Sequence, residues 1–331
     1  MTECAHRLCV APMMDWTDRH CRFFLRLLAP RTRLYTEMVP ATALLRGDPR
    51  RFLAFDPAER PLALQLGGSD PEELARAAAL AEAAGFDEVD LNCGCPSDRV
   101  RRGRFGACLM AEPALVAECV AAMRAAVRVP VTVKCRIGID DQPVPEALFA
   151  FLEAIRAAGC RIVIVHARKA WLAGLSPAEN RTVPPLEYGV VRMAKEAFPD
   201  LTIVLNGGIR DPEAVRAALA WADGAMIGRQ AYTDPWSLRA MEEAAFGTPP
   251  PPLDRARVLE AMAEYAEARA REGVPVRAIA RHLLGLVHGL PGARAWRGRL
   301  VAAVHAPDAG PWVLRAAAAA LAEGGPRAAA A

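Results

Sequence analysis

The chain has 331 residues, of which 53% are hydrophobic and 24% are charged. This composition is typical of a globular protein with a large core, and it excludes an integral membrane protein because no apolar run reaches the roughly 18–20 residues of a membrane-spanning helix. The net charge of +3 is too small to identify a partner. The first fifteen residues carry charged side chains and no apolar stretch, so we expect no signal peptide and a cytoplasmic location.

The cysteines predict reduced thiols and no metal site. Their number is nine, an odd count that does not suit a disulfide framework in a chain of this size. The chain has no pair of cysteines separated by two residues, and Cys93 and Cys95 have only one residue between them. A zinc site is therefore not expected.

Short apolar segments alternate with helical patterns over most of the chain, which favours a parallel sheet built from βα units. Several segments, such as 162–165, are apolar throughout, as strands covered on both faces are. The eight strand candidates are Leu8–Ala11, Leu34–Glu37, Leu62–Leu66, Glu88–Asn92, Val131–Arg136, Ile162–His166, Thr202–Asn206 and Gly224–Ile227.

The segments between these strands carry signals for helix ends. Asp70 and Pro71 begin a predicted helix that Gly85 ends, since Asp is a preferred cap, Pro suits the first turn and Gly follows the last turn. Eight strands alternating with helices predict an α/β protein with a (β/α)8 TIM barrel. A doubly wound sheet is the alternative, but the glycine-rich fingerprint that it carries after the first strand is missing.

A proline-rich segment separates the predicted barrel from a second, helical part. Four consecutive prolines follow Thr248 and cannot continue a helix. Helical patterns resume over 254–272 and 276–286 and again from about Pro311. The predicted organisation is a barrel over 1–246, a linker over 247–253, a small helical domain over 254–325 and an alanine-rich tail over 326–331.

Polar and small residues stand where the predicted strands end, which is where barrel enzymes carry their active sites. A buried polar group without a partner is costly, so several such residues in phase with the strands indicate a ligand site. Each one alone has a simpler explanation; His166 could be a core histidine and Lys134 a charge at the rim. The set is Pro12, Met13, Met14, Gln65, Asn92, Lys134, His166, Asn206, Gly207, Gly208, Gly228 and Arg229.

The last members of this set predict a phosphate site, and others predict the cofactor. Barrels of this kind bind phosphate at the loops after strands seven and eight, where Gly207, Gly208 and Arg229 stand. Lys134 can stabilise negative charge on a reduced flavin, and Gln65 can donate to and accept from the flavin's pyrimidine edge. We therefore expect the cofactor to be FMN.

Several motifs resemble those of tRNA-dihydrouridine synthases, over nearly the whole chain from Val10 to about Leu300. The loops over 15–20 and 176–181 are similar to the bacterial A-type subfamily. Cys93 and Met14 depart from the family pattern, in which aliphatic residues are usual. The motifs are Ala11–Asp18, Tyr35–Met38, Asn92-x-Gly94-Cys95-Pro96, Lys134-x-Arg136-Ile137-Gly138, His166–Arg168 and Asn206–Ile209.

The resemblance implies an enzyme that reduces uridine at positions 20 and 20a of the tRNA D loop, with NADPH as the source of electrons. Hydride adds to C6 of uracil, the electrophilic end of the conjugated C5=C6 bond, and C5 then needs a proton. By resemblance Cys95 donates it, as a thiol with a pKa of about 8.5 can at neutral pH. Cys93 is the alternative donor.

The resemblance also implies contacts to tRNA from Asn92, Arg181, Arg294 and Arg297. The stretch over 277–299 holds five arginines and no acidic residue, and Arg99, Arg101, Arg102 and Arg104 crowd one loop. A solvated helix face is an equally good explanation of such runs. Two other functions stay open: an FMN barrel that reduces a free pyrimidine, and a non-catalytic RNA-binding protein.

Overall fold

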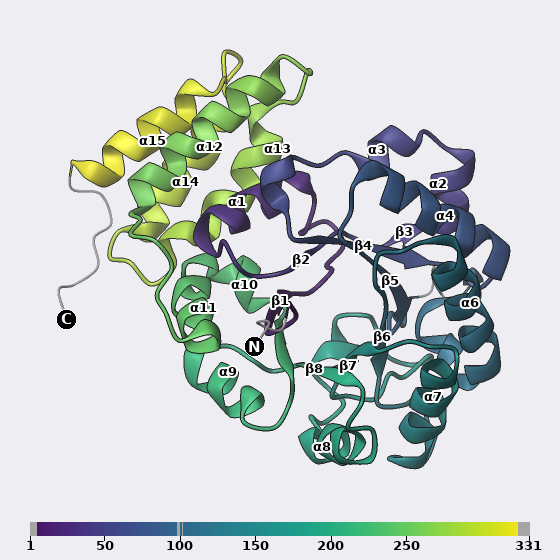
Figure 1. Cartoon of the computed structure of the whole chain (residues 1–331). Coiled ribbons are helices and arrows are strands. Elements are labelled where there is room, and N and C mark those ends of the chain that lie inside the picture. Colours follow the sequence, from purple (N-terminus) through teal and green to yellow (C-terminus); the bar gives the residue numbers. More distant parts are fainter. Residues whose placement is uncertain (1–4, 98–99, 101, 324–331) are drawn as a thin grey trace.

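The computed structural model describes residues 5–97, 100 and 102–323, and it forms a parallel (β/α)8 barrel followed by a C-terminal helical region (Figure 1). Each strand pairs in parallel with its neighbours, in the order β1-β9-β8-β7-β6-β5-β4-β2, and β3 also pairs with β4. The strands are β1 (Leu8–Val10), β2 (Leu34–Tyr35), β3 (Val39–Pro40), β4 (Leu62–Gly67), β5 (Glu88–Cys93), β6 (Val131–Arg136), β7 (Ile162–His166), β8 (Thr202–Asn206) and β9 (Gly224–Ile227).

Backbone hydrogen bonds between β1 and Arg33, just before β2, close the barrel. Val10 donates to the Arg33 carbonyl at 2.9 Å, and Arg33 donates to the Leu8 carbonyl at 3.0 Å. All eight strand candidates are confirmed as strands, but the second, predicted over 34–37, is present only as β2, and β3 was not predicted. β2 ends before Thr36, whose hydroxyl accepts a hydrogen bond from the backbone N–H of Gln65 at 3.1 Å in place of a backbone carbonyl.

Helices surround the barrel as the predicted alternation requires (Figure 1). The helix over Pro71–Ala84 is capped by Asp70 and ends at Gly85, which has a φ of +96°. The helical elements of this part are α1 (Arg19–Leu28), α2 (Ala41–Arg46), α3 (Pro49–Leu53), η1 (Pro57–Glu59), α4 (Pro71–Ala84), η2 (Gly106–Ala111), α6 (Pro113–Ala126), α7 (Glu146–Ala157), η3 (Glu179–Arg181), α8 (Tyr188–Ala197), α9 (Pro212–Leu219), α10 (Gln230–Thr233), η4 (Pro235–Ser237) and α11 (Leu238–Phe246).

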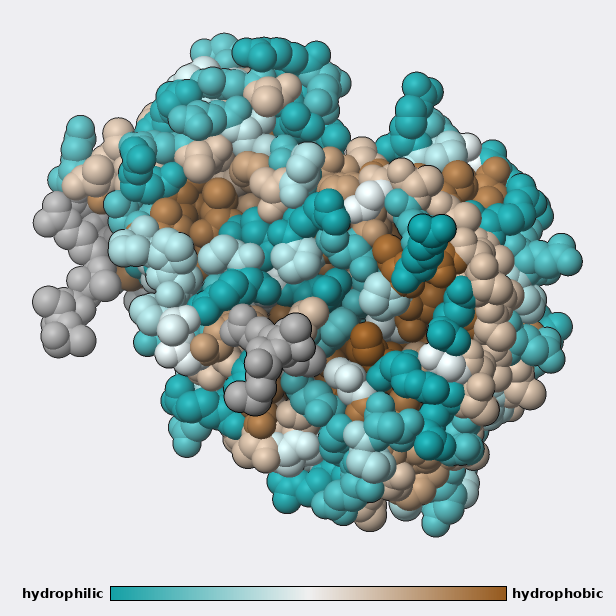
Figure 2. Space-filling view, viewed as in Figure 1, coloured by the Kyte–Doolittle hydropathy of each residue, from teal (hydrophilic) through white to brown (hydrophobic). Residues whose placement is uncertain are grey.

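The C-terminal helical region lies beside α1 at one side of the barrel (Figure 1). It consists of α12 (Arg255–Ala270), α13 (Val276–Ala280), η5 (Arg281–Val287), α14 (Ala293–Val304) and α15 (Trp312–Ala322). Within the described ranges, none of the helices has both the length and the apolar character needed to cross a membrane. Figure 2 shows hydrophilic side chains over much of the visible face of this region, with hydrophobic residues in the hollows between the elements.

The sequence prediction for this region was incomplete. The helix α14 was not predicted as an element, although Ala293, Trp296, Leu300 and Val304 form a buried stripe along it. Gly298 and three arginines interrupt the apolar pattern of α14, which hid the periodicity. The predicted single helix over 276–286 is α13 followed by the 3-10 helix η5.

The interior of the barrel is unusually polar. A small cluster of seven buried residues, including Tyr35, Ile164 and Met226, is separate from the large core between sheet and helices. Beside it lie Glu88 and Asp90, both with no exposed surface. Two buried carboxyl groups inside a barrel need partners, and these partners connect the bottom of the barrel to the open end.

Candidate active site

Five polar side chains converge at the C-terminal ends of β4 to β8. The strand register places Asn92 opposite Lys134, and His166 opposite Asn206. The parallel strands bring residues far apart in the sequence to one end of the barrel, as expected of a barrel active site. The five residues are Gln65, Asn92, Lys134, His166 and Asn206.

Asn92 orients the loop that carries Cys95. Its side-chain oxygen accepts hydrogen bonds from the backbone N–H groups of Gly94, at 3.1 Å, and Cys95, at 3.0 Å. The Asn92 amide nitrogen donates to the Gln65 side-chain oxygen at 2.8 Å. The Asn92 oxygen is thus used to shape the loop, and one N–H of its amide remains for a ligand.

The two candidate thiols lie in different environments. Cys93 ends β5, has no exposed surface and belongs to the core between sheet and helices, where burial raises its pKa well above the usual value. Cys95 is partly exposed, and its sulfur lies 3.5 Å from the Ser97 hydroxyl. Only Cys95 of the two can reach a ligand at the barrel mouth.

Lys134 lies at the centre of the polar group. Its ammonium donates to the Asn206 side-chain oxygen at 3.1 Å. Burial, together with the charge of Arg136, lowers the pKa of Lys134 to about 8, while the charge of Asp90 opposes this shift. A lysine that is costly to charge in the free protein gains from an anionic ligand, because the ligand supplies the missing counter-charge.

Glycines and arginines gather after β7, β8 and β9. Gly207 and Gly208 have φ angles of +112° and +74°, and a Cβ on Gly207 would lie 2.8 Å from the His166 ring. A Cβ on Gly228 would meet nothing within 4 Å, so open space adjoins the chain before Arg229. The tight backbone and the open space are suited to an anion held by N–H groups.

The arginines after β7, β8 and β9 lie close enough for their charges to repel one another. Burial lowers the pKa of Arg168, and the charges of Arg229 and Arg210 lower it further. The buried Nε of Arg168 has no hydrogen-bond partner among the described residues. Burial lowers the pKa of His166 well below its usual value, with nearby cations adding to the shift, so this ring is neutral. A buried donor beside several cations indicates a phosphate-sized anion.

The remaining predicted residues are divided between the barrel mouth and the C-terminal helical region. Pro12 and Met13 follow β1, Met13 packs against the inner cluster, and Met14 is 55% exposed. Arg181 is exposed, and its carbonyl accepts a hydrogen bond from Arg229 at 3.2 Å. Arg294 is exposed on α14 and Arg297 partly exposed, in the C-terminal region and away from Cys95. Arg99 and Arg101 lie outside the described residues.

The sequence reasoning missed three contributors: Arg136, Asp90 and Arg168. The Arg136 guanidinium donates to the carbonyls of Gly94, at 3.1 Å, and Asn180, at 2.8 Å, so it links the Cys95 loop to the loop after β7. Arg136 and Arg168 belong to the motifs that resemble the family. Asp90 lies two residues before Asn92 on β5, so both side chains are on the same face of the strand. The period of two along these strands was the signal that could have found Asp90 and Arg136.

A parallel barrel whose strand ends carry a reachable thiol, a half-buried lysine and a group of glycines and arginines defines a TIM-barrel enzyme. Residues 9–322 match the family model described as dihydrouridine synthase (Dus), and the chain belongs to this family. It is 58% identical to the tRNA-dihydrouridine(20/20a) synthase of Xanthomonas axonopodis pv. citri, over 93% of this chain and 91% of that protein.

Two further relatives bear the same name. The tRNA-dihydrouridine(20/20a) synthase of Pseudomonas aeruginosa is 56% identical over 91% of each chain. That of Vibrio parahaemolyticus is 52% identical over 93% of this chain and 95% of that protein. The resemblance inferred from the motifs is confirmed, and the enzyme is an oxidoreductase.

Proposed function

We propose that this enzyme reduces the C5=C6 bond of uridines 20 and 20a in the D loop of tRNA, with FMN as cofactor and NADPH as reductant. The single observation that carries the proposal is the placement of Cys95. Its loop is fixed by Asn92 and Arg136 at the open end of the barrel, beside Lys134 and the anion site. The names of the relatives supply the substrate positions.

The donor set of the barrel mouth fits FMN. The phosphate would be held by the backbone at 207–208 and 228 with Arg229 and Arg168, where a buried guanidinium nitrogen lacks a partner among the described residues. Lys134 and Gln65 would hold the flavin ring, and Pro12, Met13 and Met14 would line its edge. When bound, FMN supplies the hydride that adds to C6 of uracil.

The chain's own residues then deal with the proton and the charge. Negative charge develops on C5 and O4 of the uracil as C6 is reduced, and the Cys95 thiol donates its proton to C5. The spare N–H of the Asn92 amide is available to hold the uracil or its ribose. Arg136 holds the loop of Cys95 in place, since its guanidinium donates to the Gly94 carbonyl at 3.1 Å.

The RNA must also be held outside the site. A stacked uridine reaches a barrel mouth only after it is swung out of the RNA, which requires contacts to the surrounding nucleotides. We assign these contacts to Arg181 at the mouth and to Arg294 and Arg297 of a helical tRNA-binding domain over 254–325. A tRNA substrate also places the enzyme in the cytoplasm.

The test is to map dihydrouridine in tRNA from a strain that lacks the gene, and from the same strain complemented with it. We expect dihydrouridine at positions 20 and 20a to vanish and return, and the purified protein to be yellow. Unchanged dihydrouridine at both positions in the deletion strain would contradict the proposed substrate. Reduction of free pyrimidines but not of tRNA would favour the free-pyrimidine enzyme instead.

A further inference from the structure

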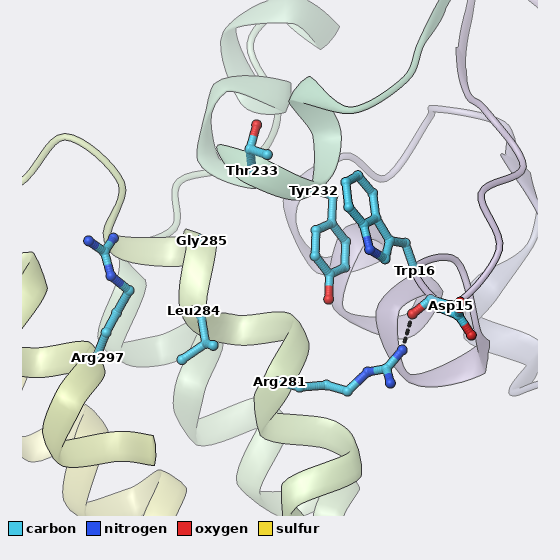
Figure 3. Close-up of a pocket in the computed structure, with 8 residues that line it drawn as sticks. All are labelled: Asp15, Trp16, Tyr232, Thr233, Arg281, Leu284, Gly285 and Arg297. Atoms are coloured by element: carbon cyan, nitrogen blue, oxygen red, sulfur yellow. Dashed lines mark hydrogen bonds between the residues drawn. The ribbon is translucent and has the colours of Figure 1, made fainter. Parts of the chain in front are cut away.

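A cavity lies at the junction between the barrel and the C-terminal helices, and its lining includes no residue of the Cys95 loop. Its volume is about 570 Å³, within the range of roughly 300–1,000 Å³ that small-molecule sites occupy. The barrel contributes the loop after β1 and the helix α10, and the C-terminal region contributes η5 and α14 (Figure 3). Its lining is Asp15, Trp16, Tyr232, Thr233, Arg281, Leu284, Gly285 and Arg297.

An aromatic pair forms one wall of this junction cavity. The rings of Trp16 and Tyr232 stack with their centroids 4.4 Å apart and their planes 11° from parallel (Figure 3). Tyr232 in turn packs edge-on against His282 of η5, with centroids 5.7 Å apart. The wall is therefore held between the two parts of the chain and offers flat, apolar surface to a ligand.

The loop that presents Trp16 is fixed by its own backbone. Asp15 adopts a φ of +64°, which an Asp tolerates better than most residues, and Trp16 donates a backbone hydrogen bond to the Met13 carbonyl at 3.1 Å. Arg281 of η5 donates to the Asp15 carbonyl (Figure 3). Hydrogen bonds on either side thus hold a residue with a positive φ, and the loop presents Trp16 in a defined position.

The close approach of η5 to α10 also requires a residue without a side chain. A Cβ on Gly285 would lie 2.7 Å from the Tyr232 carbonyl oxygen and 2.7 Å from Cδ of Pro235. The helices η5 and α10 therefore pack closely at this edge of the cavity, with no room for a side chain at position 285.

The charged residues that line the cavity are Asp15, Arg281 and Arg297, so positive charge is in excess there. The Arg281 guanidinium lies 3.9 Å from the Asp18 carboxylate, which compensates part of the positive charge of Arg281. Arg297 lines the opposite side, and in the described part of the chain its side chain forms no ion pair or hydrogen bond. An aromatic wall with arginines at the edge matches a nucleotide, whose base stacks and whose phosphate pairs with guanidinium groups.

We propose that the junction cavity binds one nucleotide of the RNA substrate other than the uridine that is reduced. The inference rests on the proposed function, and it adds a second base-binding site whose lining residues do not include Cys95. RNA is recognised mainly through unstacked bases in loops, which lie against aromatic side chains. Arg294, one helical turn before Arg297, extends the positive surface beyond the cavity, as suits a long polyanion.

The test compares tRNA transcripts that each lack the base of a single nucleotide near the target uridine. We expect one such transcript to bind the wild-type holoenzyme about 5- to 100-fold more weakly, the loss expected for one stacked base. In Leu284→Trp the larger side chain fills the cavity. This variant should bind the intact tRNA as weakly as the wild type binds the transcript that lacks the critical base. Its affinity for that transcript should be no lower than its affinity for the intact tRNA. If the loss of affinity caused by Leu284→Trp adds in full to the loss caused by the missing base for every transcript, the proposal is overturned.

A second pair of variants keeps the test independent of the folding of Leu284→Trp. Arg297→Ala should raise the KM for tRNA at unchanged kcat, whereas Arg299→Ala, about 200° round the same helix, should not. Equal effects of the two substitutions would show a general attraction and overturn the proposal. An increased KM for NADPH alone would assign the cavity to the adenosine of the reductant instead. A wild-type enzyme that reduces no tRNA would contradict the proposed function itself.

Discussion

Asp90 accepts a hydrogen bond from the Gln65 amide at 2.7 Å, and this contact begins a chain of hydrogen bonds that ends at Cys95. Because the Gln65 nitrogen points to Asp90, its oxygen points to Asn92, and the Asn92 oxygen is then directed to the backbone of Cys95. A buried carboxyl group thus sets the orientation of two amides whose nitrogen and oxygen ends would otherwise be interchangeable.

The protonation of Asp90 follows from its other partner. The Thr132 hydroxyl lies 2.9 Å from Asp90 and 3.0 Å from Glu88, yet it has one proton to donate. Burial, together with the charge of Glu88, raises the pKa of Asp90 to about 7, although the hydrogen bond from Gln65 opposes this shift. Glu88 is ionised, since His6, Arg33 and Tyr35 hold its pKa low in spite of burial. A protonated Asp90 donates to Thr132, and Thr132 donates to Glu88.

We expect Asp90→Asn to make the stability of the enzyme less sensitive to a rise in pH from about 4 to about 7. The folded-state pKa of Asp90 is raised above its unfolded value of about 4, so Asp90 stabilises the wild type fully below about pH 4, and this contribution is lost as pH rises through about 7. Asn mimics the protonated acid and removes this loss. The measurement is denaturant unfolding of both holoenzymes at pH 5 and pH 8. The stability of the variant relative to wild type should be greater at pH 8, and an equal difference at both pH values would contradict the assignment.

Cys95→Ala should lose dihydrouridine formation by about two to four orders of magnitude, as for loss of a general acid. Flavin content and NADPH oxidation should remain, because the thiol is not among the residues that hold the cofactor. The matched control is Cys93→Ala, which removes a thiol two residues away that faces the core. If the control loses the activity and Cys95→Ala keeps it, the proton donor has been misassigned.

Arg229→Ala should weaken FMN retention by about 1.5–3 kcal/mol, since a phosphate loses a charged hydrogen-bond donor. The measurement is the dissociation constant of FMN, followed by its fluorescence. Arg216→Ala on α9 is an appropriate control because Arg216 is exposed on a nearby helix. If Arg229→Ala retains full FMN occupancy with an unchanged dissociation constant, the assignment of the phosphate to this position is contradicted.

Arg294→Ala and Arg297→Ala should weaken tRNA binding without changing the flavin content. If an arginine pairs with a phosphate, its removal should reduce the slope of log affinity against log salt by about 0.7–0.9. An arginine that binds a base edge would instead lower the affinity on removal and leave the slope almost unchanged. Affinities should be measured across a salt series, with Arg299→Ala as control. Wild-type affinity of the double variant at every salt concentration would make these arginines an ordinary solvated helix face.

The role of α14 in the core explains why its arginines face outward. Trp296 is only 2% exposed, and its indole N–H donates to the Ala317 carbonyl of α15 at 3.3 Å. Trp296 therefore packs in the core between α14 and α15. With Trp296 and Leu300 fixing the inner stripe, Arg294 and Arg297 lie on the remaining surface of the helix.

The sequence alone determined the barrel, the order of its strands and the identity of the family. Apolar strands have a local signature, and the motifs after β1, β5 and β8 are contiguous, so both are visible without coordinates. It also separated Cys95 from the buried cysteines by its motif, and the exposure of Cys95 agrees. The position of Asn92 in the site followed from its place at a strand end.

Only the tertiary structure decided which of these residues contact one another. Asp90, Gln65 and Asn92 are contributed by two strands, and Arg136 reaches Gly94 and Asn180 over 42 and 44 positions of sequence. The junction cavity joins Trp16 to Tyr232 and Arg297, which no periodicity relates. Strand and helix patterns report local burial, whereas hydrogen-bond partners and cavity walls depend on how distant segments pack, and that is fixed only when the whole chain folds.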